Sequence, residues 1–169
     1  MALELALAVT LVGFLVLFWL TPLGVPTLRR LGGGEMPPDL RFGYRPDEAY
    51  SLIERYGPRG RAHWRRMLLL DMVFPALYAA LFALLLLRWA DWMHAGPFWR
   101  AAAAAPLLAG ASDYAENVLL LKVLRALPRR IPTALVAASL FTRAKFIFSW
   151  LTLVIPLAFW GWTIVSRFH

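Results

Sequence analysis

Two carboxylic acids and an amide interrupt an otherwise apolar stretch of the chain between Ala101 and Leu121. Asp113, Glu116 and Asn117 are spaced at i, i+3 and i+4, so a helix would carry all three on one side. Ionisable groups inside an apolar run are costly unless they are paired or hydrated, and we expect this side to face inward. Neighbouring carboxyls in an apolar site can hold different protonation states, which proton transfer requires.

A later apolar stretch carries the natural counter-charge for these acids. Lys145 lies on a narrow polar stripe with Thr142, Ser149 and Thr152, at helical positions i, i+3, i+7 and i+10 when counted from Thr142. We therefore predict that Lys145 pairs with Asp113 and Glu116.

An earlier apolar stretch adds Asp71 and Tyr78, with Pro75 between them on the same helix side. Pro75 removes one backbone hydrogen bond and permits a kink. Counted at about 1.5 Å per residue from the basic flanks, Asp71 and Asn117 lie at a comparable depth. The polar groups of the separate helices should therefore converge at one level, on an interior cavity.

The remaining composition indicates a membrane protein. Of the 169 residues, 60% are hydrophobic and eight are tryptophan, which is atypical of a soluble domain of this size. Apolar runs near twenty residues are expected for spanning helices. We predict an all-α integral membrane four-helix bundle formed by a single domain over 1–169, with spans at about 3–23, 67–89, 101–123 and 142–165.

The long polar segment 26–66 is expected to be a cytoplasmic loop with one short amphipathic helix. Pro46, Asp47 and Glu48 are typical of a helix start, and Gly57 with Pro58 is typical of a helix end. This loop holds nine arginines, and residues 122–130 hold four basic residues. The positive-inside rule then predicts a multi-pass protein of a bacterial inner membrane with both termini outside.

Several functional classes are excluded or disfavoured by what the sequence lacks. It has no cysteine, which excludes disulfides and cysteine-bound metals. It has no nucleophile elbow, zinc-binding His-Glu-x-x-His motif, phosphate-binding glycine loop or paired histidines for haem. We expect no cofactor, no metal site and no nucleic-acid partner, since the basic residues flank apolar runs rather than form a basic globular fold.

Three functions remain open for the polar cluster. In the first, it binds a small lipid-like or isoprenoid-like ligand and transfers protons to or from it. Asp113, Glu116 and Lys145 would then be the catalytic groups, and the ligand-binding residues would be Asp71, Tyr78, Asn117, Thr142 and Ser149. In the second, the cluster fixes helix packing in an accessory subunit of a larger membrane complex. In the third, the chain dimerises and transports protons or cations.

The pattern Asp71-x-x-Phe74-Pro75-x-x-Tyr78, then Asp113-x-x-Glu116-Asn117 and Ser139-x-x-Thr142-x-x-Lys145, resembles that of small bacterial integral membrane proteins of four helices. This likeness implies no particular activity. The layout is also similar to the EXPERA family of sterol isomerases and the sigma-2 receptor, through an acid followed by proline in the second span, here in residues 70–75. The third span does not match, and no histidine within the predicted spans corresponds to the catalytic histidine of the isomerases. The resemblance implies a sterol-like or isoprenoid-like ligand.

Overall fold

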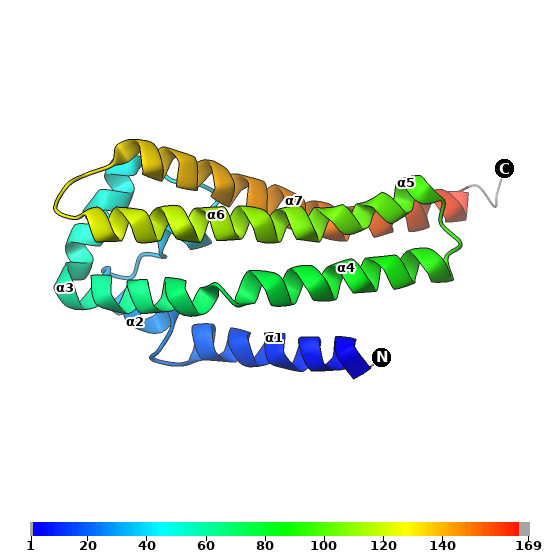
Figure 1. Ribbon diagram of the computed structural model, residues 1–169, viewed down its shortest axis with the longest axis horizontal. Helices are drawn as coiled ribbons and strands as arrows, with labels where there is room; N and C mark the ends of the chain where they lie inside the picture. The colour runs from blue at the N-terminus through cyan, green and yellow to red at the C-terminus, as the bar shows by residue number, and fades with distance from the viewer. Residues whose placement is uncertain (1, 166–169) are drawn as a thin grey trace.

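The computed structural model describes residues 2–165, which form helices and connecting loops without a β-strand. Four long helical rods lie side by side (Figure 1). They are α1 (Ala2–Leu20), the second half of α3 (Pro46–Asp71) continued by α4 (Phe74–Trp92), α6 (Ala104–Ala126) and α7 (Pro132–Val165). The short elements are α2 (Val25–Leu31), η1 (Pro38–Leu40), α5 (Pro97–Arg100) and η2 (Ala101–Ala103). The predicted all-α four-helix bundle is confirmed.

In the part of the chain that the structure describes, three helical stretches are long and apolar enough to cross a membrane: Ala2–Leu31, Pro46–Trp92 and Pro132–Thr163. The fourth rod, α6, is less apolar because it carries Asp113, Glu116 and Asn117 near its middle. All three of these side chains are buried inside the bundle, as expected from their common helix side.

The predicted amphipathic helix is the first half of α3, and it covers one end of the bundle (Figure 1). Glu48 accepts a hydrogen bond from the backbone N–H of Arg45 and so caps the helix start. The apolar stripe Ala49, Leu52, Ile53 and Tyr56 is fully buried. At Gly57 the backbone turns with φ 60° and ψ −172°, and the helix resumes at once along the bundle, well before the predicted span begins at residue 67.

A break at Met72 and Val73 separates α3 from α4. Pro75 is its cause, since proline cannot donate a hydrogen bond to the Asp71 carbonyl and its ring would collide with that carbonyl. The backbone instead makes shorter-range bonds, from Met72 N to Leu69 O and from Val73 N to Leu70 O. The break lies beside the Asp71 side chain, so it shapes the site described below.

Close packing sets α4 against α6 at the level of the polar residues. A Cβ on Gly110 would lie 3.0 Å from Ala79 Cβ and 3.1 Å from the Pro75 carbonyl oxygen. Only a hydrogen fits there, so glycine allows the two helices to approach closely, as the small residues of this stretch predict. The most extensive contact between helices joins α6 to α7, which follow each other through a tight connection.

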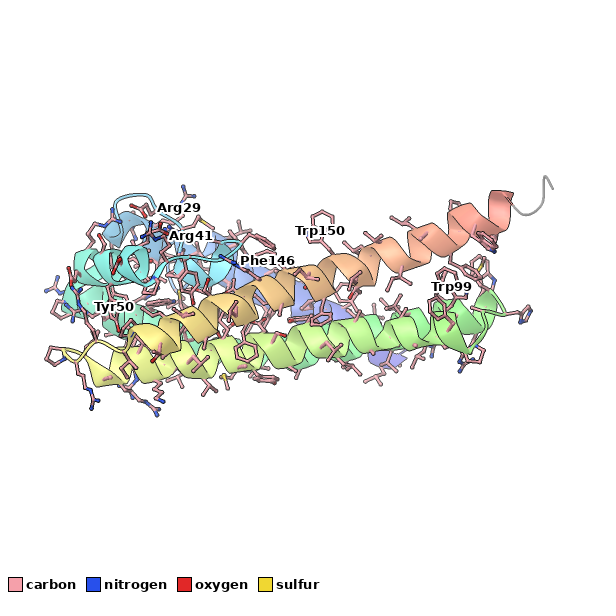
Figure 2. The ribbon with its side chains drawn as sticks, turned by 90° about the horizontal axis from the view of Figure 1, so that it is seen from above. Arg29, Arg41, Tyr50, Trp99, Phe146 and Trp150 are labelled. Carbon is pink, nitrogen blue, oxygen red and sulfur yellow. The ribbon has the colours of Figure 1, made fainter. Side chains whose placement is uncertain are left out.

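The apolar core is concentrated at the end covered by α3. It contains buried residues from four helices, α2, α3, α6 and α7, including Leu28, Trp64, Leu120 and Leu135. A small second cluster at the opposite end is formed by Ala90, Ala95 and Phe159, against which Trp89 and Trp99 pack edge-on. Figure 2 shows Trp99 at this end and Arg29, Arg41 and Tyr50 at the other.

Helix α1 lies along α4 and packs mainly on α4 and α2. The chain then reverses tightly at Gly24, where a Cβ would lie only 2.0 Å from the Phe18 carbonyl oxygen. The reversal returns Val25 and Leu28 of α2 to the core, where both are buried. On the side of the bundle where α1 lies, α1 is the outermost helix.

Candidate functional site

Lys145 is at the centre of the polar cluster. Its ammonium lies 2.7 Å from Glu116 Oε2 and 3.1 Å from Asp113 Oδ1, and it donates a third hydrogen bond to the Asp39 carbonyl oxygen at 3.1 Å. The Lys145 side chain is 13% exposed, Asp113 6% and Glu116 0%. The predicted pairing of Lys145 with both acids is present, and three acceptors satisfy its three N–H groups.

Two hydroxyl groups, from Tyr78 and Thr142, hold these acids in place. Tyr78 OH donates to Asp113 Oδ2 at 3.2 Å, so a residue of α4 joins the α6–α7 cluster. Thr142 Oγ1 lies 2.5 Å from Glu116 Oε1, and it also bonds the Ala138 carbonyl one turn earlier on α7. Both oxygens of Glu116 and both oxygens of Asp113 are thus bonded to side chains of neighbouring helices.

Asp71 and Asn117 form a separate pair next to this cluster. Asn117 Nδ2 donates to Asp71 Oδ2 at 2.8 Å and links α3 to α6. Asn117 is completely buried, and its carbonyl oxygen Oδ1 has no hydrogen-bond partner within residues 2–165. Asp71 lines the cavity described below, whereas Asn117 lies behind it. Asp71 and Asn117 meet because they lie at a comparable depth in their helices, as the sequence predicts.

Asp39 is a site residue that the sequence analysis did not identify. It belongs to η1, in the loop before α3, and lines the same cavity as Asp71, Asp113 and Lys145. Burial raises the pKa of Asp39 above its ordinary value, while the positive charge of Lys145 acts in the opposite direction. A loop rich in proline and glycine carries no periodic signal that separates Asp39 from the neighbouring Glu35, so only the folded chain reveals this position.

The loop that carries Asp39 is fixed to α7 at three points. The first is the Lys145 bond to the Asp39 carbonyl, and the second is a bond from Tyr44 N–H to Ser139 Oγ at 2.9 Å. The third is Gly43, with φ 88°, where a Cβ would lie 2.5 Å from the Nε atom of Arg143. The loop therefore closes the polar end of the cavity as a fixed wall.

A cavity of about 440 Å³ lies between these polar groups and helix α1. Its polar wall consists of Asp39, Asp71, Tyr78, Asp113, Lys145 and Ser149. The rest of its surface is aliphatic or aromatic, with Leu11, Leu15 and Leu68 among the aliphatic residues and a set of rings from four helices: Phe14, Phe18, Trp19, Trp64, Phe74, Phe82 and Phe146. Most residues of the polar wall were predicted from the sequence. No residue of the aromatic wall was predicted, because aromatic residues in apolar helices give no positional signal.

Cavities of this volume, mainly apolar with a few convergent polar groups, are typical of small-molecule sites. The predicted residues Asp71, Tyr78, Asp113, Lys145 and Ser149 line it, whereas Glu116, Asn117 and Thr142 lie behind these in contact with them. Chemically, the arrangement can bind a donor group at its carboxyls and can pass a proton between hydrogen-bonded acids, a phenol and an amine.

Within residues 2–165 no group of three or more histidine, cysteine or acidic residues is arranged to hold a metal ion. Comparison with protein-family models, with curated proteins and with solved structures gives no match to this chain.

Proposed function

We propose that this protein is a multi-pass membrane protein that binds a small amphipathic lipid in the cavity between α1 and the Lys145 cluster. The observation that carries the proposal is the cavity itself, about 440 Å³ in volume, with aromatic side chains on one wall and Asp71, Asp113 and Lys145 on the other. A ligand with an apolar chain and a polar, hydrogen-bonding group matches this division.

Membrane residence is supported by the outer surfaces of the helices. Large apolar side chains point outward along α1 and α7, with Leu5 67%, Leu20 75% and Leu157 68% exposed. Contiguous exposed apolar surface of this kind requires lipid or protein to cover it. The arginine-rich segment 26–66 and the basic residues from Lys122 to Arg130 lie at one end of the bundle, which the positive-inside rule assigns to the cytoplasm of a bacterial inner membrane.

In this proposal the two carboxyl groups bonded to Lys145 are the proton-handling groups. Asp113 faces the cavity and bonds Tyr78, so it is the acid that contacts the ligand. Glu116, which accepts a hydrogen bond from Thr142, holds Lys145 from behind, and Asn117 orients Asp71. Asp71 and Ser149 remain to bond the polar group of the ligand.

Binding of tritium-labelled farnesol to the purified protein in detergent, measured by scintillation proximity, tests the proposal. We expect saturable binding that Ser149→Leu weakens about tenfold, because it places branched carbon in the cavity and removes a hydroxyl. Thr133→Leu is the matched control, since Thr133 is exposed on the same helix outside the cavity. Absence of saturable binding by the wild type, or equal loss in both variants, would contradict the proposal.

A second candidate function is a packing role in a larger membrane complex. The observation in its favour is that the three acceptors around Lys145 satisfy it without any ligand. Such a network specifies helix register, since polar contacts between membrane helices stabilise by only about 0.6 kcal/mol each. Co-purification of the chain with a stable partner, combined with no farnesol binding, would favour this role.

A further inference from the structure

A second hollow, of about 470 Å³, adjoins the first between the C-terminal end of α1 and the arginines of α2. It is lined by Trp19, Val25, Pro26, Arg29, Arg30 and Gly34. Trp19 and Val25 also line the cavity beside Lys145, so the two spaces are adjacent. An elongated molecule in that cavity that passed Trp19 would reach the two arginines.

Both guanidinium groups in this hollow are held in place by neutral acceptors. Arg29 Nε donates to the Gly34 carbonyl at 3.2 Å, and Arg30 Nη2 donates to Thr27 Oγ1 at 3.2 Å. Each of these bonds uses one N–H group of a side chain that has five. Neither arginine forms a salt bridge with a carboxylate of residues 2–165.

Glu35, the acid nearest to Arg29 and Arg30 in the sequence, forms salt bridges with two other arginines. Its carboxylate pairs with Arg41 at 3.0 Å and with Arg55 at 2.5 Å. Hydrogen bonds from these two arginines lower the pKa of Glu35, so it is ionised and committed to them at neutral pH. Among the described residues, Arg29 and Arg30 therefore have no carboxylate partner, and they line a hollow that shares Trp19 and Val25 with the cavity beside Lys145.

We propose that the hollow at Arg29 and Arg30 binds the phosphate of a single-chain phosphorylated lipid whose chain occupies the cavity beside Lys145. Two guanidinium forks match phosphate oxygens in geometry and charge. Three carboxyl groups, those of Asp39, Asp71 and Asp113, line the polar wall and disfavour a phosphate there, so only uncharged parts of the ligand lie against that wall. This inference rests on the proposed function, because it adds a phosphate site for a ligand of the same cavity.

Farnesyl monophosphate and farnesol, which share one chain, are the probes that test it. With the wild-type protein in neutral detergent at low salt, we expect farnesyl monophosphate to bind about tenfold more tightly than farnesol, from two arginines near the phosphate. In Arg29→Gln/Arg30→Gln this preference should disappear while farnesol binding is unchanged. Arg59→Gln/Arg125→Gln, which removes two exposed arginines outside the hollow, should keep the preference.

Equal affinities of the wild type for the two probes would overturn the inference and leave the proposed function standing, whereas binding of neither probe would overturn both. A preference lost equally in the Arg59/Arg125 control would mean general surface attraction and would also overturn it.

If inorganic phosphate at equal concentration displaced farnesyl monophosphate, the site would be one for free phosphate rather than lipid, and the inference would be wrong. If the double variant does not fold, Arg30→Gln alone should reduce the preference several-fold, and an unchanged ratio would refute the assignment.

Discussion

The Lys145 ammonium lies 2.7 Å from Glu116 Oε2, and the other carboxylate oxygen of Glu116 accepts the Thr142 hydroxyl. Glu116 is 0% exposed, so these two residues of α7 supply the polar contacts that water would otherwise supply. A buried charge is tolerated here because its partner is on the helix with which α6 makes its most extensive contact.

Lys145→Met should strongly destabilise the bundle, because it leaves Asp113 and Glu116 buried without their counter-charge. Removing one partner of a buried ion pair costs about 3–5 kcal/mol. Equilibrium unfolding in mixed detergent and SDS micelles measures this loss. Lys122→Met is the matched control, since Lys122 is exposed near the end of α6 and should change stability by less than about 0.5 kcal/mol.

The triple variant Lys145→Met/Asp113→Asn/Glu116→Gln should recover much of that stability, because neutral amides no longer need the ammonium. If Lys145→Met alone has no more effect than Lys122→Met, the acids are hydrated or protonated and the ion-pair description is wrong.

Tyr78→Phe tests the link between α4 and the cluster. It removes the hydroxyl that donates to Asp113 Oδ2 and should cost about 1 kcal/mol of stability. Because Tyr78 lines the cavity, the variant should also weaken farnesol binding several-fold. Tyr114→Phe is the control, as Tyr114 lies outside the cavity lining, and an equal change in both variants would argue against a specific contact.

Gly110→Ala tests the close approach of α4 and α6. The added methyl would lie 3.0 Å from Ala79 Cβ and 3.1 Å from the Pro75 carbonyl, so the helices must separate at about 1–3 kcal/mol. Gly13→Ala in α1 has nothing within 4 Å and should stabilise by roughly 0.5–1 kcal/mol. Thermal unfolding of the two variants should therefore shift in opposite directions, and a shared direction would contradict the packing at Gly110.

Asp39 should make stability depend on pH. Its pKa is raised from an ordinary 3.8, so between that pH and the raised value the unfolded chain releases a proton that the folded chain retains. Stability from this group is therefore greatest in acid and falls as pH rises through that window, then levels off. Asp39→Asn removes the effect, so its stability relative to the wild type should increase with pH above about 4. A difference independent of pH would mean that Asp39 is not desolvated between Lys145, Asp113 and Trp64.

Much of the fold follows from local patterns in the sequence. The carboxyls of α6 face inward because their i, i+3, i+4 spacing places them on one side, and the α3 break occurs beside Pro75 because proline lacks an N–H group. Pro46, Glu48 and Gly57 likewise delimit the amphipathic helix that covers the bundle end. These features depend on residues near one another in the chain.

The features that could not be predicted from the sequence depend on contacts between residues far apart in the chain. Asp39 enters the site because Lys145 bonds its backbone carbonyl and Tyr44 bonds Ser139, contacts that no local pattern encodes. Helix α2 is short and lies in a segment rich in arginine and glycine, so burial of Val25 and Leu28 rather than helix periodicity stabilises it. The aromatic wall depends on how α1 packs beside α4, which hydropathy alone does not determine.

Mass spectrometry of lipids extracted from the protein, purified from its membrane in mild detergent, is the sharpest test of whether the cavity holds a lipid. We expect one small single-chain amphipathic lipid, at a near-stoichiometric ratio in the wild type and Thr133→Leu, and strongly depleted in Ser149→Leu. Equal amounts of bulk membrane lipid in all three samples, with no enriched species, would contradict it.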